Sequence, residues 1–150
     1  MIDGHTHHSL HFHDHTNQEL HGHEQTYHEP HIHDHANDPA IYSETHKYDL
    51  AEQVSALEIQ QVLFLWIEDV KQWVKNNGGF TGHIKIFVES QENLWLSSTG
   101  KSINVKQSSA WNELFTANIT VNVTAIIFGV SPDTLKEVCR RRLEACLQSL

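Results

Sequence analysis

Histidine is distributed so unevenly along this chain that it divides the sequence into two parts with different prospects of folding. Thirteen of the fourteen histidines lie between His5 and His46, and the remaining one is His83. Large apolar residues are rare over the first 40 positions and follow neither a helical nor a strand period. Burial on that scale cannot offset the entropy lost when a backbone is ordered. The sequence therefore predicts a disordered, histidine-rich arm over residues 1–47 and a folded domain over residues 48–150.

Formal charge follows a similar division. Residues 1–49 carry nine acidic side chains and one lysine, which gives a formal charge of −8. Residues 50–150 carry ten acidic and nine basic side chains, so that this part of the chain is close to neutral. We expect no nucleic-acid partner, because a near-neutral domain leaves no basic surface to neutralise phosphates.

The arm contains an internal repeat of side chains that bind metals. His11–His15 has the sequence H-F-H-D-H, which recurs twenty positions later as H-I-H-D-H over His31–His35. Neutral imidazole is the commonest side-chain ligand for divalent transition metals, and a flexible backbone can turn several rings and a carboxylate toward one ion. At three or four ligands per ion, the histidines of the arm could hold about three to four ions of nickel, zinc or cobalt. The predicted ligands are His5, His7, His8, His11, His13, Asp14, His15, His21, His23, His28, His31, His33, Asp34, His35 and His46.

Residues 5–46 resemble the histidine-rich segments of nickel- and zinc-handling accessory proteins. Such segments occur in hydrogenase and urease maturation factors, some prolyl isomerases and metal-uptake proteins. The resemblance is carried by the composition and by the two H-x-H-D-H runs, and it implies metal storage or delivery, as in a metallochaperone. The GTPase motifs of the hydrogenase-type factors are absent, so that activity is not carried over. Residues 50–150 resemble no family that we recognise.

The second part of the chain has the periodicities of an α+β domain. Apolar residues at steps of mostly three and four predict a helix over residues 48–77, ended by Gly78 and Gly79. Alternating apolar residues predict strands over residues 83–89, 94–97, 103–106 and 117–128. Ser131 and Pro132 then suit the cap and first position of a final helix. The order predicts a two-layer sandwich, helix–antiparallel strands–helix, with both helices on one face of the sheet.

Two short motifs suggest sites that their surroundings do not support. Gly100–Ser102 ends like a phosphate-binding loop, but Trp95 stands where the first glycine belongs and no helix follows, so a hairpin turn is favoured. His5-Thr6-His7 resembles the opening H-x-H of metal-dependent hydrolases of the amidohydrolase and polymerase–histidinol-phosphatase types. Those enzymes need a strand before the motif and a barrel of about 250 residues. We therefore reject this second interpretation.

Several single residues allow a functional and a plain structural interpretation. For His83 a surface histidine at a strand end is favoured over a metal ligand, and for Cys139 and Cys146 small core residues are favoured over a functional thiol. Arg140–Arg142 forms either a solvated face or a contact with the acidic arm. No nucleophile–base pair or pair of carboxylates stands at a diagnostic spacing, so we expect no enzyme.

The predicted function is the binding, storage or delivery of divalent nickel, zinc or cobalt by the arm. The domain would dimerise or dock on a client metalloprotein or transporter. Near residues 62–67 the predicted helix is apolar on all sides, which favours contact with a second copy of the chain. The alternative is that residues 50–150 are an interaction or small-ligand-binding module with an incidental solubilising tail. The longest apolar run, Val62–Ile67, is far shorter than the roughly 20 residues of a membrane span. No signal peptide is visible, so we expect a cytoplasmic protein.

Overall fold

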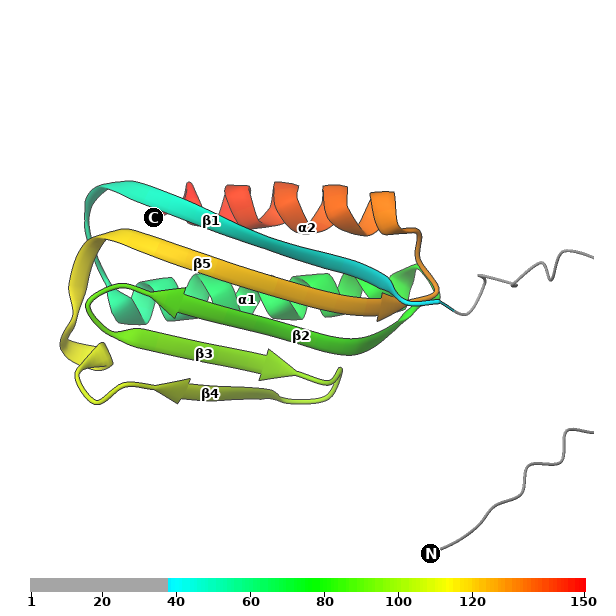
Figure 1. Ribbon diagram of the computed structural model, residues 1–150, viewed down its shortest axis with the longest axis horizontal. Helices are drawn as coiled ribbons and strands as arrows, with labels where there is room; N and C mark the ends of the chain where they lie inside the picture. Colours follow the sequence, from blue (N-terminus) through cyan, green and yellow to red (C-terminus); the bar gives the residue numbers. More distant parts are fainter. Residues whose placement is uncertain (1–37) are drawn as a thin grey trace, which may run out of the picture. The chain divides into compact units, whose positions relative to one another are not determined.

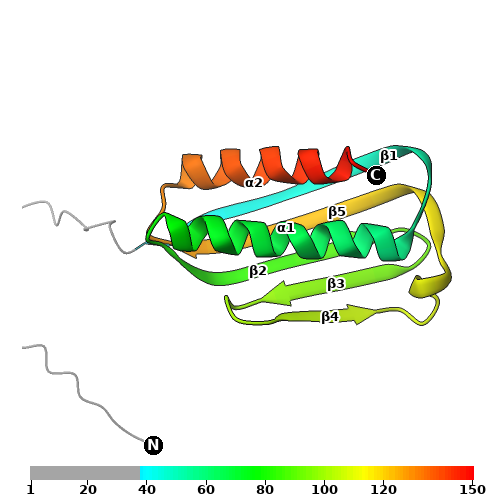
Figure 2. The same cartoon turned by 180° about the vertical axis from the view of Figure 1, so that it is seen from behind.

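Five antiparallel strands form one sheet in the part of the chain that the computed structural model describes, residues 38–150. The sheet order is β1-β5-β2-β3-β4, and both helices lie on one face of it (Figures 1 and 2). The elements are β1 (Ala40–Ser55), α1 (Ala56–Asn76), β2 (Phe80–Glu89), β3 (Asn93–Ser98), β4 (Ile103–Gln107), the 3-10 turn η2 (Trp111–Glu113), β5 (Phe115–Phe128) and α2 (Pro132–Leu147). The predicted α+β sandwich is confirmed, and residues 1–37 of the predicted arm lie outside the described residues.

The first strand was missed in the sequence, and the prediction of a helix from residue 48 was wrong. Residues 40–49 pair with β5 in one continuous antiparallel register. The helix begins only at Ala56, where Ser55 caps it: the Ser55 Oγ accepts from the Glu58 N–H at 3.3 Å, and the Glu58 carboxylate accepts from the Ser55 N–H at 3.2 Å. This reciprocal pair is a capping box, which fixes the first turn. The expected boundary between residues 47 and 48 therefore falls inside β1.

The core lies between the helices and the inner face of the sheet. Alternate residues of β5 from Ile119 to Ile127 are buried, as their period predicted, and α1 and α2 bury apolar stripes against them. Each fully buried Leu, Ile or Val side chain contributes about 1.5–3 kcal/mol relative to an exposed one. The two helices are also joined by a hydrogen bond, which the Trp66 Nε1–H donates to the Cys139 carbonyl at 3.3 Å.

The expected end of α1 and the expected start of α2 are confirmed. Gly78 adopts a φ of 74°, which L side chains rarely adopt, and it ends α1. Next to it, a Cβ on Gly79 would lie 2.6 Å from the Phe128 carbonyl oxygen, so only glycine fits where the chain enters β2. At α2, Pro132 occupies the first turn and the Ser131 Oγ accepts from the Thr134 N–H at 3.2 Å.

Candidate functional site

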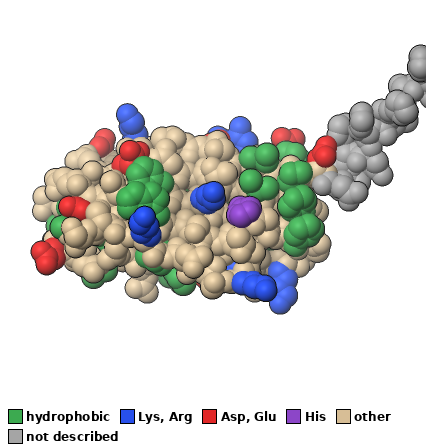
Figure 3. Space-filling view, turned by 60° about the horizontal axis from the view of Figure 1, so that its bottom comes forward, with side chains coloured by type: hydrophobic (Ala, Val, Ile, Leu, Met, Phe, Trp, Pro, Cys, Tyr) green, Lys and Arg blue, Asp and Glu red, His purple; other side chains and the backbone are tan. Residues whose placement is uncertain are grey.

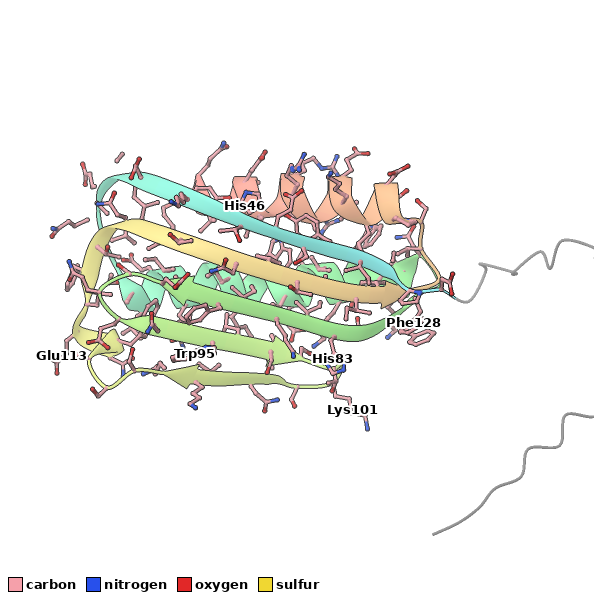
Figure 4. All side chains as sticks on the ribbon, in the orientation of Figure 1. His46, His83, Trp95, Lys101, Glu113 and Phe128 are labelled. Atoms are coloured by element: carbon pink, nitrogen blue, oxygen red, sulfur yellow. The ribbon has the colours of Figure 1, made fainter. Side chains whose placement is uncertain are left out.

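His46 is the one predicted metal ligand that lies within the described residues. The other fourteen belong to residues 1–37, and their roles stay predictions. His46 lies on β1, on the face of the sheet that α2 covers, and it is partly buried (Figure 4). Its Nε2 is 3.1 Å from the Tyr42 hydroxyl and 3.2 Å from Glu44 Oε2. This nitrogen is therefore engaged by neighbours on its own strand.

Glu44 is the centre of this polar cluster. Tyr42 donates its hydroxyl proton to Glu44 Oε2 at 3.2 Å, and the Nε–H of Arg140 donates to the same oxygen at 3.1 Å. A second guanidinium N–H of Arg140 donates to Glu44 Oε1, and the Lys136 ammonium lies 3.9 Å from that oxygen. One carboxylate on the edge strand thus receives two cations from α2.

The ionisation of the cluster follows from these contacts. Hydrogen bonds from Arg140 lower the pKa of Glu44, because they stabilise the charged carboxylate. The pKa of Tyr42 is raised, first by burial and then by the nearby Glu44 charge. At neutral pH the cluster therefore holds an ionised Glu44 and a protonated Tyr42, a balance that suits a structural ion pair.

A metal ion has poor access to His46 through Nε2. An ion bound there would have to displace the Tyr42 and Glu44 contacts and lie close to the Arg140 guanidinium, which repels cations. Over residues 38–150, no group of three or more His, Cys, Asp or Glu side chains comes together in a way that could hold a metal ion. Any role of His46 as a ligand stays a prediction.

The two cysteines are structural, as the sequence predicted. Cys139 is buried in the core, and Cys146 is partly buried against it. Burial raises the pKa of each thiol to about 12. Since the thiolate is the form that binds metal, these thiols are weak ligands at neutral pH.

The outer face of the sheet, away from the helices, carries exposed aromatic and polar side chains. Phe87 of β2 stacks on Trp95 of β3 with ring centroids 5.1 Å apart, and the Lys106 ammonium lies 5.8 Å from the Trp95 ring centre. Phe80 stacks on Phe128 at 4.6 Å. Figure 4 places Trp95 and Phe128 apart along the sheet, and the space-filling view in Figure 3 shows hydrophobic side chains in two separate groups.

His83 also lies on this outer face, exposed and opposite Ile126 of β5. That position agrees with the interpretation of His83 as a surface histidine. Trp95 is flanked across the strands by Phe87 and Lys106, which cover part of its indole, and it is 39% exposed.

Two of the open grooves on the surface of residues 38–150 have volumes of about 450 and 460 Å³. One, of about 450 Å³, lies at the end of the sheet between β1, β5 and the β2–β3 turn, and polar residues such as Asp49, Ser90 and Asn118 line it. The other, of about 460 Å³, lies between the last turns of α1, the start of β2 and the β3–β4 turn. Lys71, Lys75 and Lys101 line this second groove.

Comparison with known proteins finds little. No protein-family model and no curated protein matches the chain. Among solved structures, the chain is similar to Zn(II)-bound YjiA GTPase from E. coli and to a Zn(II)-bound triple mutant of that GTPase, each at 10% identity and a TM-score of 0.37. Each match covers 68% of this chain and 29% of the other. None of the helices in residues 38–150 is long and apolar enough to cross a membrane.

The contact between Glu44 and Arg140 answers part of a question that the sequence left open. Contact of the three arginines with the acidic arm, predicted over residues 1–47, was one of two interpretations, and Arg140 makes such a contact with Glu44. Arg142 instead pairs with Asp69 of α1. The individual partner of Arg140 was not predicted, because Glu44 was assigned to a disordered arm rather than to a strand beside α2.

Proposed function

We propose that this chain binds divalent transition-metal ions through its N-terminal arm and stores or delivers them. The observation that carries the proposal is the H-x-H-D-H sequence, present at His11–His15 and again at His31–His35. Each copy offers three imidazoles and one carboxylate within five residues, a donor set that suits nickel, zinc or cobalt.

The cysteines and the first strand of the described domain support the proposal. Cys139 is buried and Cys146 partly buried, and residues 38–150 form no group that could hold a metal ion, so we assign metal binding to the arm. The strand β1 continues directly from the arm and is fixed by pairing with β5 and by the Glu44–Arg140 contact. The arm is therefore covalently attached to a stably folded carrier, which a client metalloprotein, a transporter or a second copy could recognise.

A competitive metal titration followed by mass spectrometry of the intact chain tests this proposal. The decisive variant replaces His11, His13, His15, His31, His33 and His35 with asparagine. We expect this variant to lose about half or more of the bound nickel or zinc, since most ligands of each predicted cluster are removed. His83→Asn is the matched control, because His83 lies on the outer face of the sheet, and it should leave the ion count unchanged. Equal loading of both variants would contradict the proposal.

The alternative function, a small-ligand-binding or interaction module, is favoured by a different observation. The lysine-lined groove of about 460 Å³ is within the size range of ligand pockets, which is about 300–1,000 Å³. It could serve its own ligand whether or not the arm binds metal.

A further inference from the structure

The lysine-lined groove brings together positive charges from three separate elements. Lys71 and Lys75 belong to the last turns of α1, and Lys101 belongs to the turn between β3 and β4. Glu68 is the one carboxylate among the residues that line the groove, against these three ammonium groups. Figure 4 shows Lys101 at the turn, with its side chain extending away from the sheet.

Lys71 is held in place at the base of the groove. Its side chain is only 11% exposed, and its ammonium donates to Glu68 Oε1 at 2.8 Å and to the Lys101 carbonyl at 2.8 Å. An ammonium has three N–H donors, so one remains for a ligand. The contact with the Lys101 carbonyl also fixes the β3–β4 turn against α1, which sets the width of the groove.

Lys75 and Lys101 are unpaired: within residues 38–150 no hydrogen bond or ion pair engages either ammonium. A lysine in the last turn of a helix often serves to satisfy the terminal carbonyls. Here that role is already filled by the backbone. The N–H groups of the three residues after the helix donate to carbonyls of its last turn: Asn77 to Trp73, Gly78 to Lys75 and Gly79 to Val74. The Lys75 ammonium is therefore available to a ligand, since no group within residues 38–150 engages it.

We propose that this groove binds a small soluble molecule through its phosphate or diphosphate group. Two free ammonium groups and the remaining donor of Lys71 supply charge-assisted hydrogen bonds to phosphate oxygens. Thr81 and Thr99 also line the groove and offer hydroxyl donors. Gly100 and Lys101 thus line the proposed phosphate site from a hairpin turn, and its donors come from several elements rather than from a loop that precedes a helix.

The test uses the full chain freed of metal, so that it is independent of the proposed metal function. Sodium pyrophosphate is titrated at neutral pH in about 0.15 M chloride, where exposed charges are screened over about 8 Å. Calorimetry gives the affinity, and backbone amide NMR locates the site. We expect saturable binding, with the largest shifts at Thr81, Thr99 and Gly100.

Two double variants with the same change of charge decide the outcome. Lys75→Gln with Lys101→Gln should weaken pyrophosphate binding about tenfold or more, since each substitution removes a charge-assisted hydrogen bond to a phosphate oxygen. Lys85→Gln with Lys106→Gln changes two lysines of the sheet outside the groove and should leave the affinity within about twofold. Thermal unfolding of both variants verifies that they are folded. Absence of saturable binding, equal weakening in the two variants, or shifts centred elsewhere would overturn the proposal.

Discussion

Arg140 of α2 forms a two-point ion pair with Glu44 of β1, 96 residues earlier in the chain, donating from Nε at 3.1 Å and from a second guanidinium nitrogen. The pair joins the C-terminal helix to the strand that follows the arm. Because Arg140 stabilises the ionised carboxylate, the pKa of Glu44 is lower in the folded protein than its ordinary value of 4.5. The contact therefore stabilises the fold above about pH 4.5, and its contribution is lost as the pH falls through the lower, folded pKa.

Glu44→Gln should lower the midpoint of thermal unfolding at pH 7. The difference from the wild type should shrink as the pH falls below 4.5, because protonation removes the same ion pair from the wild type. Glu137→Gln is the control, since Glu137 is exposed on α2, the helix that carries Arg140. A pH-independent difference for Glu44→Gln would mean that Arg140 does not act through the charge of Glu44.

Removal of residues 1–37 should leave a domain that unfolds cooperatively, whereas removal of residues 1–47 should not. The longer deletion takes away half of β1, including the buried Ala40 and Tyr42 and their pairing with β5. Loss of one large buried aromatic side chain alone costs about 3–5 kcal/mol, a large part of the stability of a typical domain. Circular dichroism during thermal unfolding compares the two fragments, and equal stability would show that β1 is dispensable.

This contrast also shows where sequence reasoning failed. β1 is an edge strand whose inner face carries Tyr42, Glu44 and His46, so that its period lacks the run of Val and Ile seen in β5. Its polar inner residues are tolerated because Arg140 of α2 pairs with Glu44. A contact between residues so far apart in the sequence leaves no local pattern from which it could be predicted. Leu50, Val54 and Leu57 happened to recur at helical spacing and extended the predicted helix backwards into the strand.

Other parts were predictable because local signals agreed with the tertiary structure. The strict alternation over Ile119–Ile127, the cap at Ser131 and the stop at Gly78 each depend on neighbouring residues only, and all three are confirmed. The true start of α1 was also encoded locally, in the Ser55 to Glu58 spacing of the capping box. The lysine-lined groove was not predictable, since it depends on how α1 meets the β3–β4 turn.

The native thiols should react slowly. With a pKa of about 12 for Cys139 and for Cys146, only about one thiol in ten thousand is ionised at pH 8. Labelling with a thiol reagent should therefore be much faster in denaturant than in the native chain, and Cys139 should be the slower of the two. Replacement of both cysteines by serine should leave the number of bound metal ions unchanged. Rapid labelling of the native chain would contradict the burial of the thiols.

Metal affinity should fall steeply between about pH 7 and pH 5. Metal binding requires neutral imidazole, and an unperturbed histidine has a pKa near 6.5. Protonation of the thirteen histidines in the first 46 residues would move the formal charge of residues 1–49 from −8 toward +5. Several protons are released per ion, so the fall should be steeper than for a site with one histidine. The apparent nickel affinity at half-unit pH steps measures it, and a flat profile would mean that carboxylates carry the binding.

The number of ions bound by the intact chain at neutral pH tests metal binding by the arm most directly. Equilibrium dialysis against nickel or zinc, with native mass spectrometry of the same samples, should give about three to four ions for the full chain, as expected from three or four ligands each. Residues 38–150 alone should bind at most one. Fewer than two ions on the full chain, or equal loading of the full chain and residues 38–150, would contradict the assignment of metal binding to the histidine-rich arm.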